Sequence, residues 1–305
     1  MTYEERLAGF SNHIAAGGKV ETHDWMPDDY RRGVLKFIEM HANSEIMGAL
    51  PERECLPKAP TLQRKMSLAA KIQDEVGHAQ LLYRVAEDLG KPRDAMFQDL
   101  VNGRSKFHNV FHYPVEHWGD VAIIGWLIDG AALVTQAALL DSSYAPYTRV
   151  LKRICSEEQL HLRHGEDISL ELAIGTDAQR AMFQSALDRW WLPIVHFFGP
   201  RSNVAKDLLL RWKVKTRTNE DLRQEFLDRY VPKILELGFE FPTPVPYRDG
   251  EHWRIREDDI DWQPLDAIKR NEGPETARRL TVRKEIYESH RWVRDALAEP
   301  AVRAA

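Results

Sequence analysis

The stretch AAKIQDEVGHAQLLY, residues 69–83, places Glu75 and His78 three residues apart within an apolar run of helical character. Residues three apart lie on the same face of a helix, so this spacing directs an acid and an imidazole toward the same neighbour. One such pair is expected by chance in a chain of this length, and its usual interpretation is a surface pair. The pair becomes informative only if further residues of the same kind occur at related positions in the sequence.

A second copy follows in SEEQLHLRHG, where Glu158 precedes His161, and none of the other histidines repeats the spacing. An acid on an earlier apolar segment precedes each copy. Glu45 lies 30 residues before Glu75, and Asp129 lies 29 residues before Glu158. With a rise of about 1.5 Å per residue, such a gap fits two antiparallel helices whose side chains meet at the same height.

This arrangement has a known chemical use. One carboxylate from each of two helices, with Glu-x-x-His from each of two others, builds a di-iron site inside a four-helix bundle. The sequence therefore predicts an all-α, ferritin-like bundle with extra helices. Oxygen and imidazole ligands suit iron, while zinc and manganese remain alternatives that spacing alone does not exclude. Without metal, buried acids and histidines would cost several kcal/mol each. The predicted ligands are Glu45, Glu75, His78, Asp129, Glu158 and His161.

Two further acids are candidates for supporting the histidines. Asp74 precedes Glu75, and Glu157 precedes Glu158. Metal-bound histidines usually donate their second N–H to a carboxylate. In an antiparallel pair of helices, the acid beside one Glu can reach the histidine of the other helix, so we expect Asp74 to contact His161 and Glu157 to contact His78. The alternative is that either acid faces solvent.

The composition bounds the class of protein. The chain has 305 residues, 43% of them hydrophobic, and a formal net charge of -5, which argues against a surface that binds nucleic acid. Two cysteines without metal-binding spacing and an N-terminus without a signal pattern suggest a reducing cytoplasm. No nucleotide-binding glycine motif is present, so we expect no flavin or nicotinamide site on this chain, and electrons must come from elsewhere.

Residues 121–140 are apolar enough to resemble a membrane span, but Asp129 lies in their middle, which favours a buried core helix and no membrane. The buried acid then needs a partner. After Gly238 the composition becomes rich in proline, aromatic and charged residues, and we expect a helical domain over residues 1–240 and an extended arm with a terminal helix over 241–305, packed on its own domain or on a partner. Periodicity predicts helices over residues 27–50, 61–89, 121–140, 151–172, 177–198, 219–238 and near the C-terminus.

Several longer motifs extend across nearly the whole chain. They are DWMPDDYR, HANSEIMGALPE, KAPTLQRK, QDEVGH, IGWLIDGAA, SYAPY, EEQLH, FFGP, WKVK with TNEDLRQ, and DWQ. With these motifs the chain resembles the catalytic A subunits of the bacterial phenylacetyl-CoA epoxidases, multicomponent di-iron monooxygenases of phenylacetate breakdown. An Asp at position 129, where the wider superfamily often has Glu, is itself a feature of these subunits.

The resemblance implies that the six residues above bind two iron ions and that O2 and NADPH-derived electrons are used to epoxidise the ring of phenylacetyl-CoA. It implies a CoA-thioester substrate, a ferritin-like structural partner (the C subunit), a small B subunit, and a separate reductase that carries the NADPH, flavin and iron–sulfur chemistry. The chain departs from the family at Met40, at His196 and over residues 201–208, which look shorter than their counterpart. The CoA-contacting positions implied are Lys36, Lys106, Phe107, His108, Asn109, Lys215 and Asn219.

Two other functions fit the same fold. The first is an iron-storage or ferroxidase protein, but the chain is much longer than a storage bundle needs, and Lys36, Lys71, Lys106 and Lys215 would have no role there. A non-catalytic scaffold paralogue should have lost metal ligands, whereas all six positions are kept here. Fold alone does not distinguish these functions.

Overall fold

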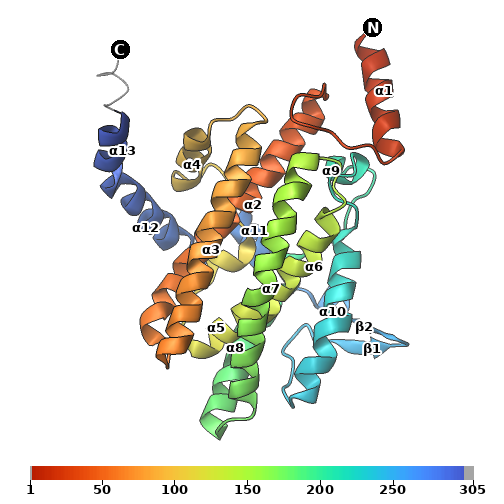
Figure 1. Ribbon diagram of the computed structural model, residues 1–305. Helices are drawn as coiled ribbons and strands as arrows, with labels where there is room; N and C mark the ends of the chain where they lie inside the picture. Colours follow the sequence, from red (N-terminus) through yellow and green to blue (C-terminus); the bar gives the residue numbers. More distant parts are fainter. Residues whose placement is uncertain (1, 299–305) are drawn as a thin grey trace.

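The computed structural model of the chain describes residues 2–298. Helices dominate it, which confirms the predicted all-α class (Figure 1). The elements in chain order are α1 (Tyr3–Ala15), α2 (Asp28–Cys55), η1 (Leu56–Lys58), α3 (Leu62–Glu87), α4 (Arg93–Val101), η2 (Asn109–His112), α5 (Trp118–Ile123), η3 (Ile124–Ile128), α6 (Asp129–Leu139), α7 (Ala145–Ala173), α8 (Asp177–Phe197), α9 (Leu208–Arg211), α10 (Asn219–Glu236), β1 (Tyr247–Asp249), β2 (His252–Arg254), η4 (Glu257–Asp259), α11 (Gln263–Lys269), α12 (Thr276–Ser289) and α13 (Arg291–Ala298).

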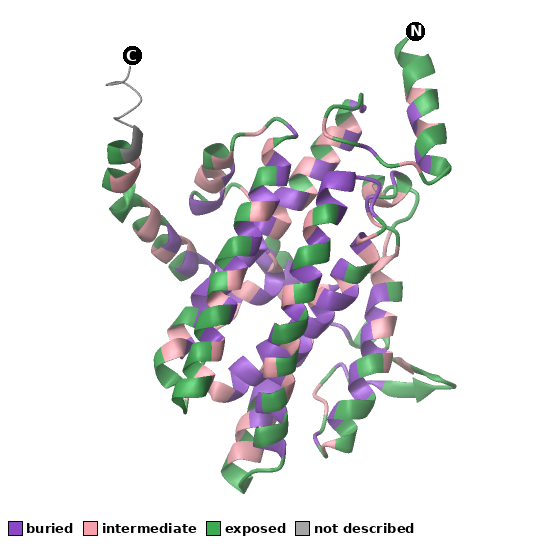
Figure 2. Cartoon of the chain, viewed as in Figure 1, coloured by how far each residue is buried: buried purple, intermediate pink, exposed green. Residues whose placement is uncertain are grey.

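Four long helical segments form the central bundle: α2, α3, the continuous α5–η3–α6 segment, and α7. The helix α2 packs along α3, α7 packs on η3 and α6, and α3 and α7 meet across the bundle. In Figure 2 the inner faces of α3 and α7 are buried, whereas their outer faces are exposed. The bundle therefore presents the two Glu-x-x-His helices side by side, with one face toward the core and the other toward solvent.

The helix α3 starts where the sequence predicts it. Thr61 is the N-cap, and its hydroxyl accepts a hydrogen bond from the Arg64 amide at 3.1 Å. Such a side chain satisfies one of the amides left without a partner at a helix N-terminus. By contrast, α2 and α7 are longer than predicted: α2 continues beyond Leu50 through Pro51 to Cys55, and α7 begins at Ala145 rather than Leu151. Proline is tolerated in the first turn, where Pro146 lies.

The apolar segment between residues 118 and 139 is a core helix of three parts. Its composition and length would suffice to cross a membrane, but 78% of its most apolar window is buried inside the protein, and in the described part of the chain no other helix passes that test. The π-helical turn η3 separates α5 from α6 and ends immediately before Asp129. Insertions of this kind are frequently found at functional sites.

A contact between two glycines sets the distance between α7 and η3. A Cβ atom added to Gly165 would lie 1.9 Å from the carbonyl carbon of Gly125, and one added to Gly125 would lie 2.8 Å from the Gly165 Cα. Backbone therefore lies directly on backbone here, and neither position can hold any larger residue without moving a helix. Asp129 lies four positions after Gly125, and Gly165 lies four positions after His161, so the contact is one helical turn from a predicted ligand on each helix.

The remaining elements cover the bundle. The helix α8 packs on α5 and α7, and α10 packs on α6 and on the β1–β2 hairpin, which is the only sheet within residues 2–298. The helices α1, α4, α9 and α11 and the hairpin were not predicted. The helices α9 and α11 and the two strands are short, whereas α1 has 13 residues and was missed. The arm returns to the bundle: Arg279 donates to the carbonyls of Phe111 and Tyr113, and Arg283 donates to the carbonyl of Ile46. The predicted domain boundary at residue 240 stays a prediction. The last residues of the arm, 299–305, lie outside the described residues.

Candidate metal centre

The six predicted ligands come together at the middle of the bundle. Glu45 lies on α2, Glu75 and His78 on α3, Asp129 at the start of α6, and Glu158 and His161 on α7. Each side chain belongs to a residue that is at most 7% exposed. Their ligand atoms form two groups, each within 4.8 Å, that share Glu158: the first adds Glu45, Glu75 and His78, and the second adds Asp129 and His161.

The two histidines direct the same ring nitrogen into the cluster. His78 Nδ1 lies 3.5 Å from Glu45 Oε2 and 3.3 Å from Glu158 Oε1. His161 Nδ1 lies 3.5 Å from Glu75 Oε1 and 3.3 Å from Glu158 Oε2. One oxygen of Glu158 therefore faces each histidine, which is the placement expected of a carboxylate that bridges two metal ions.

The opposite ring nitrogens make the two contacts expected from the sequence. His78 Nε2 lies 2.8 Å from Glu157 Oε2, and His161 Nε2 lies 3.1 Å from Asp74 Oδ2. A carboxylate accepts only, so Nε2 carries a proton, and in the neutral ring that a metal requires the lone pair is on Nδ1. His78 Nδ1 is buried and has no hydrogen-bond partner. An imidazole lone pair without a partner among carboxylate oxygens fits a metal ion.

Burial and mutual repulsion distribute the charges of the cluster unevenly. Burial, followed by the charges of Glu158 and Glu45, raises the pKa of Glu75 well above its usual range. Burial would also raise the pKa of Glu158, but the His161 and His78 rings that face its two oxygens lower it to about 2. Burial raises the pKa of Asp129 to about 7. Because ligands must be deprotonated, a bound cation would displace protons from Glu75 and Asp129.

A buried lysine is the partner that Asp129 needs. Lys71 Nζ lies 2.6 Å from Asp129 Oδ2 and 2.6 Å from Glu52 Oε1. Burial opposes the charge of Lys71, but Asp129 and Glu52 raise its pKa well above the usual value. Sequence reasoning did not assign this contact, although Lys71 lies one helical turn before Glu75 and so shares its inward face.

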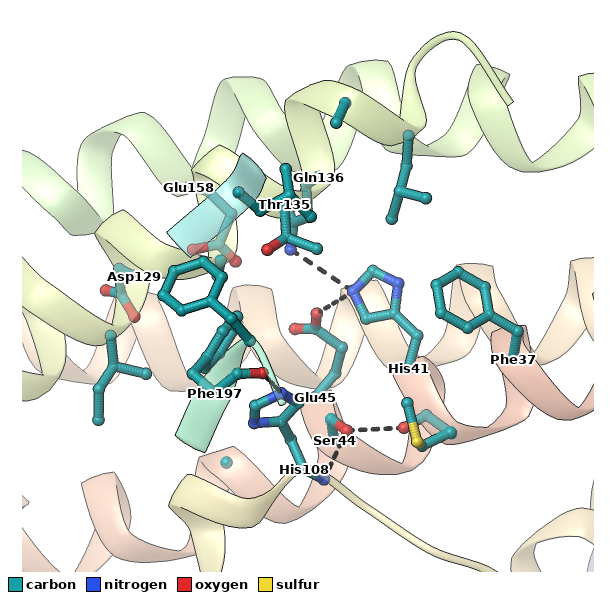
Figure 3. Close-up of a pocket in the computed structure, with 18 of the residues that line it drawn as sticks. Phe37, His41, Ser44, Glu45, His108, Asp129, Thr135, Gln136, Glu158 and Phe197 are labelled. Atoms are coloured by element: carbon teal, nitrogen blue, oxygen red, sulfur yellow. Dashed lines mark hydrogen bonds and ion pairs between the residues drawn. The ribbon is translucent and has the colours of Figure 1, made fainter. Parts of the chain in front are cut away.

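A cavity of about 280 Å³ opens beside the cluster (Figure 3). Four of the six predicted ligands line it, namely Glu45, Glu75, Asp129 and Glu158, whereas neither histidine does. Much of the remaining wall is apolar: it includes Phe37, Met40, Gly48, Phe111, Ile124, Ile128, Ala132, Leu139, Phe197, Phe198 and Leu222. The carboxylates of the cluster thus face the cavity, and the two histidines lie on the side of the cluster that faces away from the cavity.

The structure brings only part of the predicted CoA set to this cavity. His108, Lys215 and Asn219 line it, and so does Met40. Lys215 Nζ is held by Asp207 at 2.9 Å and by Asn219 Oδ1 at 3.3 Å. The cavity wall also includes Arg217, which the sequence did not single out.

The other four predicted positions do not line the cavity, because their side chains are engaged elsewhere or point to solvent. Lys36 is exposed, and Lys106 Nζ donates to Asn271 Oδ1 at 2.7 Å. Phe107 stacks on His112 with a centroid distance of 3.9 Å. Asn109 is buried and donates to the Pro193 carbonyl at 2.8 Å. His196 also lies outside the lining, with Nε2 2.7 Å from the Asp261 carbonyl oxygen.

Comparison with known proteins places the chain in a family. Residues 3–292 match the family described as "Phenylacetic acid catabolic protein". The chain is also similar to the A subunit of the 1,2-phenylacetyl-CoA epoxidase of Escherichia coli (strain K12), with 42% identity over 298 residues, which cover 97% of this chain and 96% of that protein. A match that spans the bundle, the cluster and most of the C-terminal arm leads to one conclusion: this chain belongs to the phenylacetic acid catabolic protein family.

Proposed function

We propose that this chain is the catalytic subunit of a multicomponent monooxygenase that epoxidises the aromatic ring of phenylacetyl-CoA. The observation that carries the proposal is a complete set of four carboxylates and two histidines that borders an apolar cavity. The similarity to the A chain of an epoxidase over nearly the whole length supports the substrate and the reaction. A storage protein would have no need of a cavity that reaches the cluster.

The donor set fits two iron ions held by Glu45, Glu75, His78, Asp129, Glu158 and His161. When bound, the iron pair supplies the redox chemistry that divides O2, with two electrons and two protons, between an epoxide oxygen on the ring and a molecule of water. Glu158, with an oxygen toward each histidine, is the proposed bridge. Asp74 and Glu157 hold the Nε2 proton of each histidine, so that Nδ1 stays free to bind.

The protein's own part in the reaction is to orient the substrate and to exclude water. Because the carboxylates and not the histidines line the cavity, the ring approaches the cluster from the carboxylate side. Phe111, Ile128 and Phe197 offer apolar surface for a benzene ring at this end. Apolar walls also keep bulk water away from the reacting atoms and prevent side reactions.

The CoA tail is polar and anionic, so it must leave the cavity past cationic side chains. Lys215 and Arg217 line the wall together with Asn219, and the tail's phosphates would compete with Asp207 for Lys215 and with Glu225 for Arg217. Charge-assisted hydrogen bonds are the stronger class in proteins. His108 lies in the same wall, and Lys36 and Lys106 would contribute further along the tail. The resemblance also implies Phe107 and Asn109, but a tail could contact these two only if they released His112 and the Pro193 carbonyl.

The proposal requires other proteins. A separate reductase with flavin and an iron–sulfur centre would pass electrons from NADPH, and a ferritin-like C subunit together with a small B subunit would complete the assembly. The Escherichia coli relative is one of several subunits of its epoxidase, as its name says, which supports a multisubunit complex here. A location in the cytoplasm fits two buried free cysteines, Cys55 and Cys155.

Turnover with isotopically labelled O2 tests the reaction. The chain loaded with Fe(II) is combined with its partner subunits, the reductase, NADPH and phenylacetyl-CoA, and the product is analysed by mass spectrometry. We expect one labelled oxygen atom in an epoxide of the substrate. Oxygen derived from water, or turnover that needs no iron, would refute the proposal. Uptake of iron into a mineral core without substrate oxidation would indicate a storage protein instead.

A further inference from the structure

A third histidine, on α2, contacts the cluster from the cavity side. His41 lies one helical turn before Glu45, and its Nε2 is 2.9 Å from Glu45 Oε1 (Figure 3). The Nδ1 atom of the same ring is 2.8 Å from the hydroxyl of Tyr147, which is fully buried in the first turn of α7. His41 therefore links a predicted metal ligand on one helix to a tyrosine on another.

The chemistry of the two partners fixes the proton on this ring. A carboxylate accepts only, so the contact with Glu45 requires a proton on His41 Nε2. A neutral imidazole then has its lone pair on Nδ1, and the Tyr147 hydroxyl donates to it. Gln136 Nε2 is also near His41 Nε2, but at 3.5 Å it is too distant to compete. Tyr147 thus selects the tautomer that can donate to Glu45.

The contact leaves the two oxygens of Glu45 with different surroundings. Oε1 accepts from His41, whereas Oε2 faces His78 Nδ1 at 3.5 Å inside the cluster. We propose that His41, held by Tyr147, is a positioning residue that makes Glu45 a one-oxygen metal ligand, with Oε2 offered to the metal and Oε1 retained by the His41 N–H. This inference rests on the proposed metal site.

The contact of His41 with Glu45 resembles the contacts that support the two cluster histidines, but the donor and the acceptor are exchanged: here the ligand is the carboxylate and the supporting residue is the histidine. Asp74 and Glu157 accept from ligand histidines on the solvent side of α3 and α7. His41 donates to a ligand carboxylate on the cavity side. A carboxylate with one oxygen already engaged is less able to rotate and chelate, so a bound metal would keep one coordination position that a second Glu45 oxygen could otherwise fill.

The experiment uses Co(II) as the probe, because its binding and its ligand-field absorption can be measured without turnover. The metal-free full chain is titrated calorimetrically as wild type and as the variants His41→Leu, His41→Gln and Tyr147→Phe. We expect His41→Leu and Tyr147→Phe to bind one of two Co(II) ions about 10–100-fold more weakly, with an altered absorption spectrum. His41→Gln keeps an N–H donor that reaches Glu45 and should retain most of the affinity.

Tyr30→Phe is the matched control. Tyr30 is as buried as Tyr147 and also makes one hydroxyl contact, 3.0 Å to Ser143 Oγ, but it lies away from the cluster. A purely structural role for Tyr147 would give both phenylalanine variants the same loss of thermal stability and no change in the Co(II) spectrum. Wild-type affinity and spectrum in Tyr147→Phe and His41→Leu would overturn the inference, as would a His41→Gln variant as weak as His41→Leu. Failure of the wild type to bind Co(II) would instead refute the metal site on which the inference rests.

Discussion

The Lys71 ammonium lies 2.6 Å from Asp129 Oδ2, so a proposed metal ligand is already paired with a buried cation. Glu52 holds the same ammonium from the other side at 2.6 Å. The single positive charge of Lys71 therefore lies between two carboxylates and offsets one of their charges, and a metal ion at Asp129 would share that carboxylate with the lysine or displace it. Stability and metal binding are linked at this residue.

Replacing Lys71 with Met should expose this linkage. The change leaves Glu52 and Asp129 buried without a cation, which should lower the free energy of unfolding of the metal-free protein by about 3–5 kcal/mol. Co(II) should then raise the melting temperature of the variant more than that of the wild type. Denaturant unfolding with and without Co(II) measures both effects. Lys65→Met, an exposed change on the same helix, is the control, and equal stability of the two variants would contradict the prediction.

Removing a cluster carboxylate should remove the metal. Glu75→Ala and Glu158→Ala are each expected to abolish ring oxidation and to lower the iron content, because Glu158 faces both histidines and Glu75 faces one of them. Elemental analysis and turnover of phenylacetyl-CoA are the measurements. Glu171→Ala, an exposed change further along α7, should leave both unchanged. Full iron content in either cluster variant would show that its carboxylate is not a ligand.

The acids behind the histidines should have a smaller effect. Asp74→Ala and Glu157→Ala leave the ligands in place but remove the acceptor of the histidine Nε2 proton, so either imidazole can turn or take its other tautomer. We expect metal affinity or activity to fall about 10–100-fold, with the fold retained. Calorimetric metal titration and circular dichroism test this. Wild-type behaviour in both variants would mean that the two contacts are incidental.

The cationic wall should determine the apparent Km for the CoA thioester. A charge-assisted phosphate contact is worth roughly 1.5–3 kcal/mol, so the Lys106→Ala, Lys215→Ala double variant should raise Km well over tenfold, while iron content stays the same. Added salt should weaken binding by the wild type. Because Lys215 lines the cavity and Lys106 does not, the single variants assign the effect to each residue. An exposed neighbour, Lys206→Ala, provides the baseline, and an unchanged Km in the double variant at low salt would exclude both residues.

A buried histidine at the arm should make the fold sensitive to acid. His112 is 1% exposed, bonds to Thr276 Oγ1 at 2.6 Å, and has its pKa lowered by burial from 6.5 to about 3. Below pH 6.5 the unfolded chain takes up a proton that the folded chain refuses, so stability falls as the pH decreases from 6.5 toward 3. The linkage amounts to about 2 kcal/mol between pH 7 and pH 5. Urea unfolding at both pH values should show a smaller difference for His112→Gln than for the wild type, and an identical difference would disprove it.

The clustering of the six predicted ligands could be anticipated from the sequence because two copies of one spacing, each preceded by an acid at a matching interval, constrain four helices at once. The contacts of Asp74 and Glu157 follow from the same antiparallel geometry. Lys71 is different: its spacing from Glu75 places it on the inward face of α3, but nothing local to it reveals that its partners are Asp129 and Glu52 on other helices. The His41–Tyr147 contact joins residues 106 apart, and only the folded chain reveals it.

The extent of the helices and the cavity wall were predicted less well, for physical reasons. Pro51 normally ends a helix, yet α2 continues through it, and the Arg283 guanidinium donates to the carbonyl of Ile46 nearby. That donor comes from a segment more than 200 residues away, which local preferences cannot reveal. Likewise, Lys106 and Asn109 have side chains of the right kind for a CoA tail, but Asn271 and the Pro193 carbonyl occupy them.

The glycine contact between η3 and α7 fixes the distance between these two helices beside the cluster. Where Gly125 meets Gly165, main chain contacts main chain, so no side chain lies between them that could change its rotamer or its size. Substitutions elsewhere in the core can be absorbed by neighbouring side chains before they alter the gap between the helices of Asp129 and Glu158. Residues around the cluster can therefore change during evolution while the distance between the helices that carry Asp129 and Glu158 stays the same.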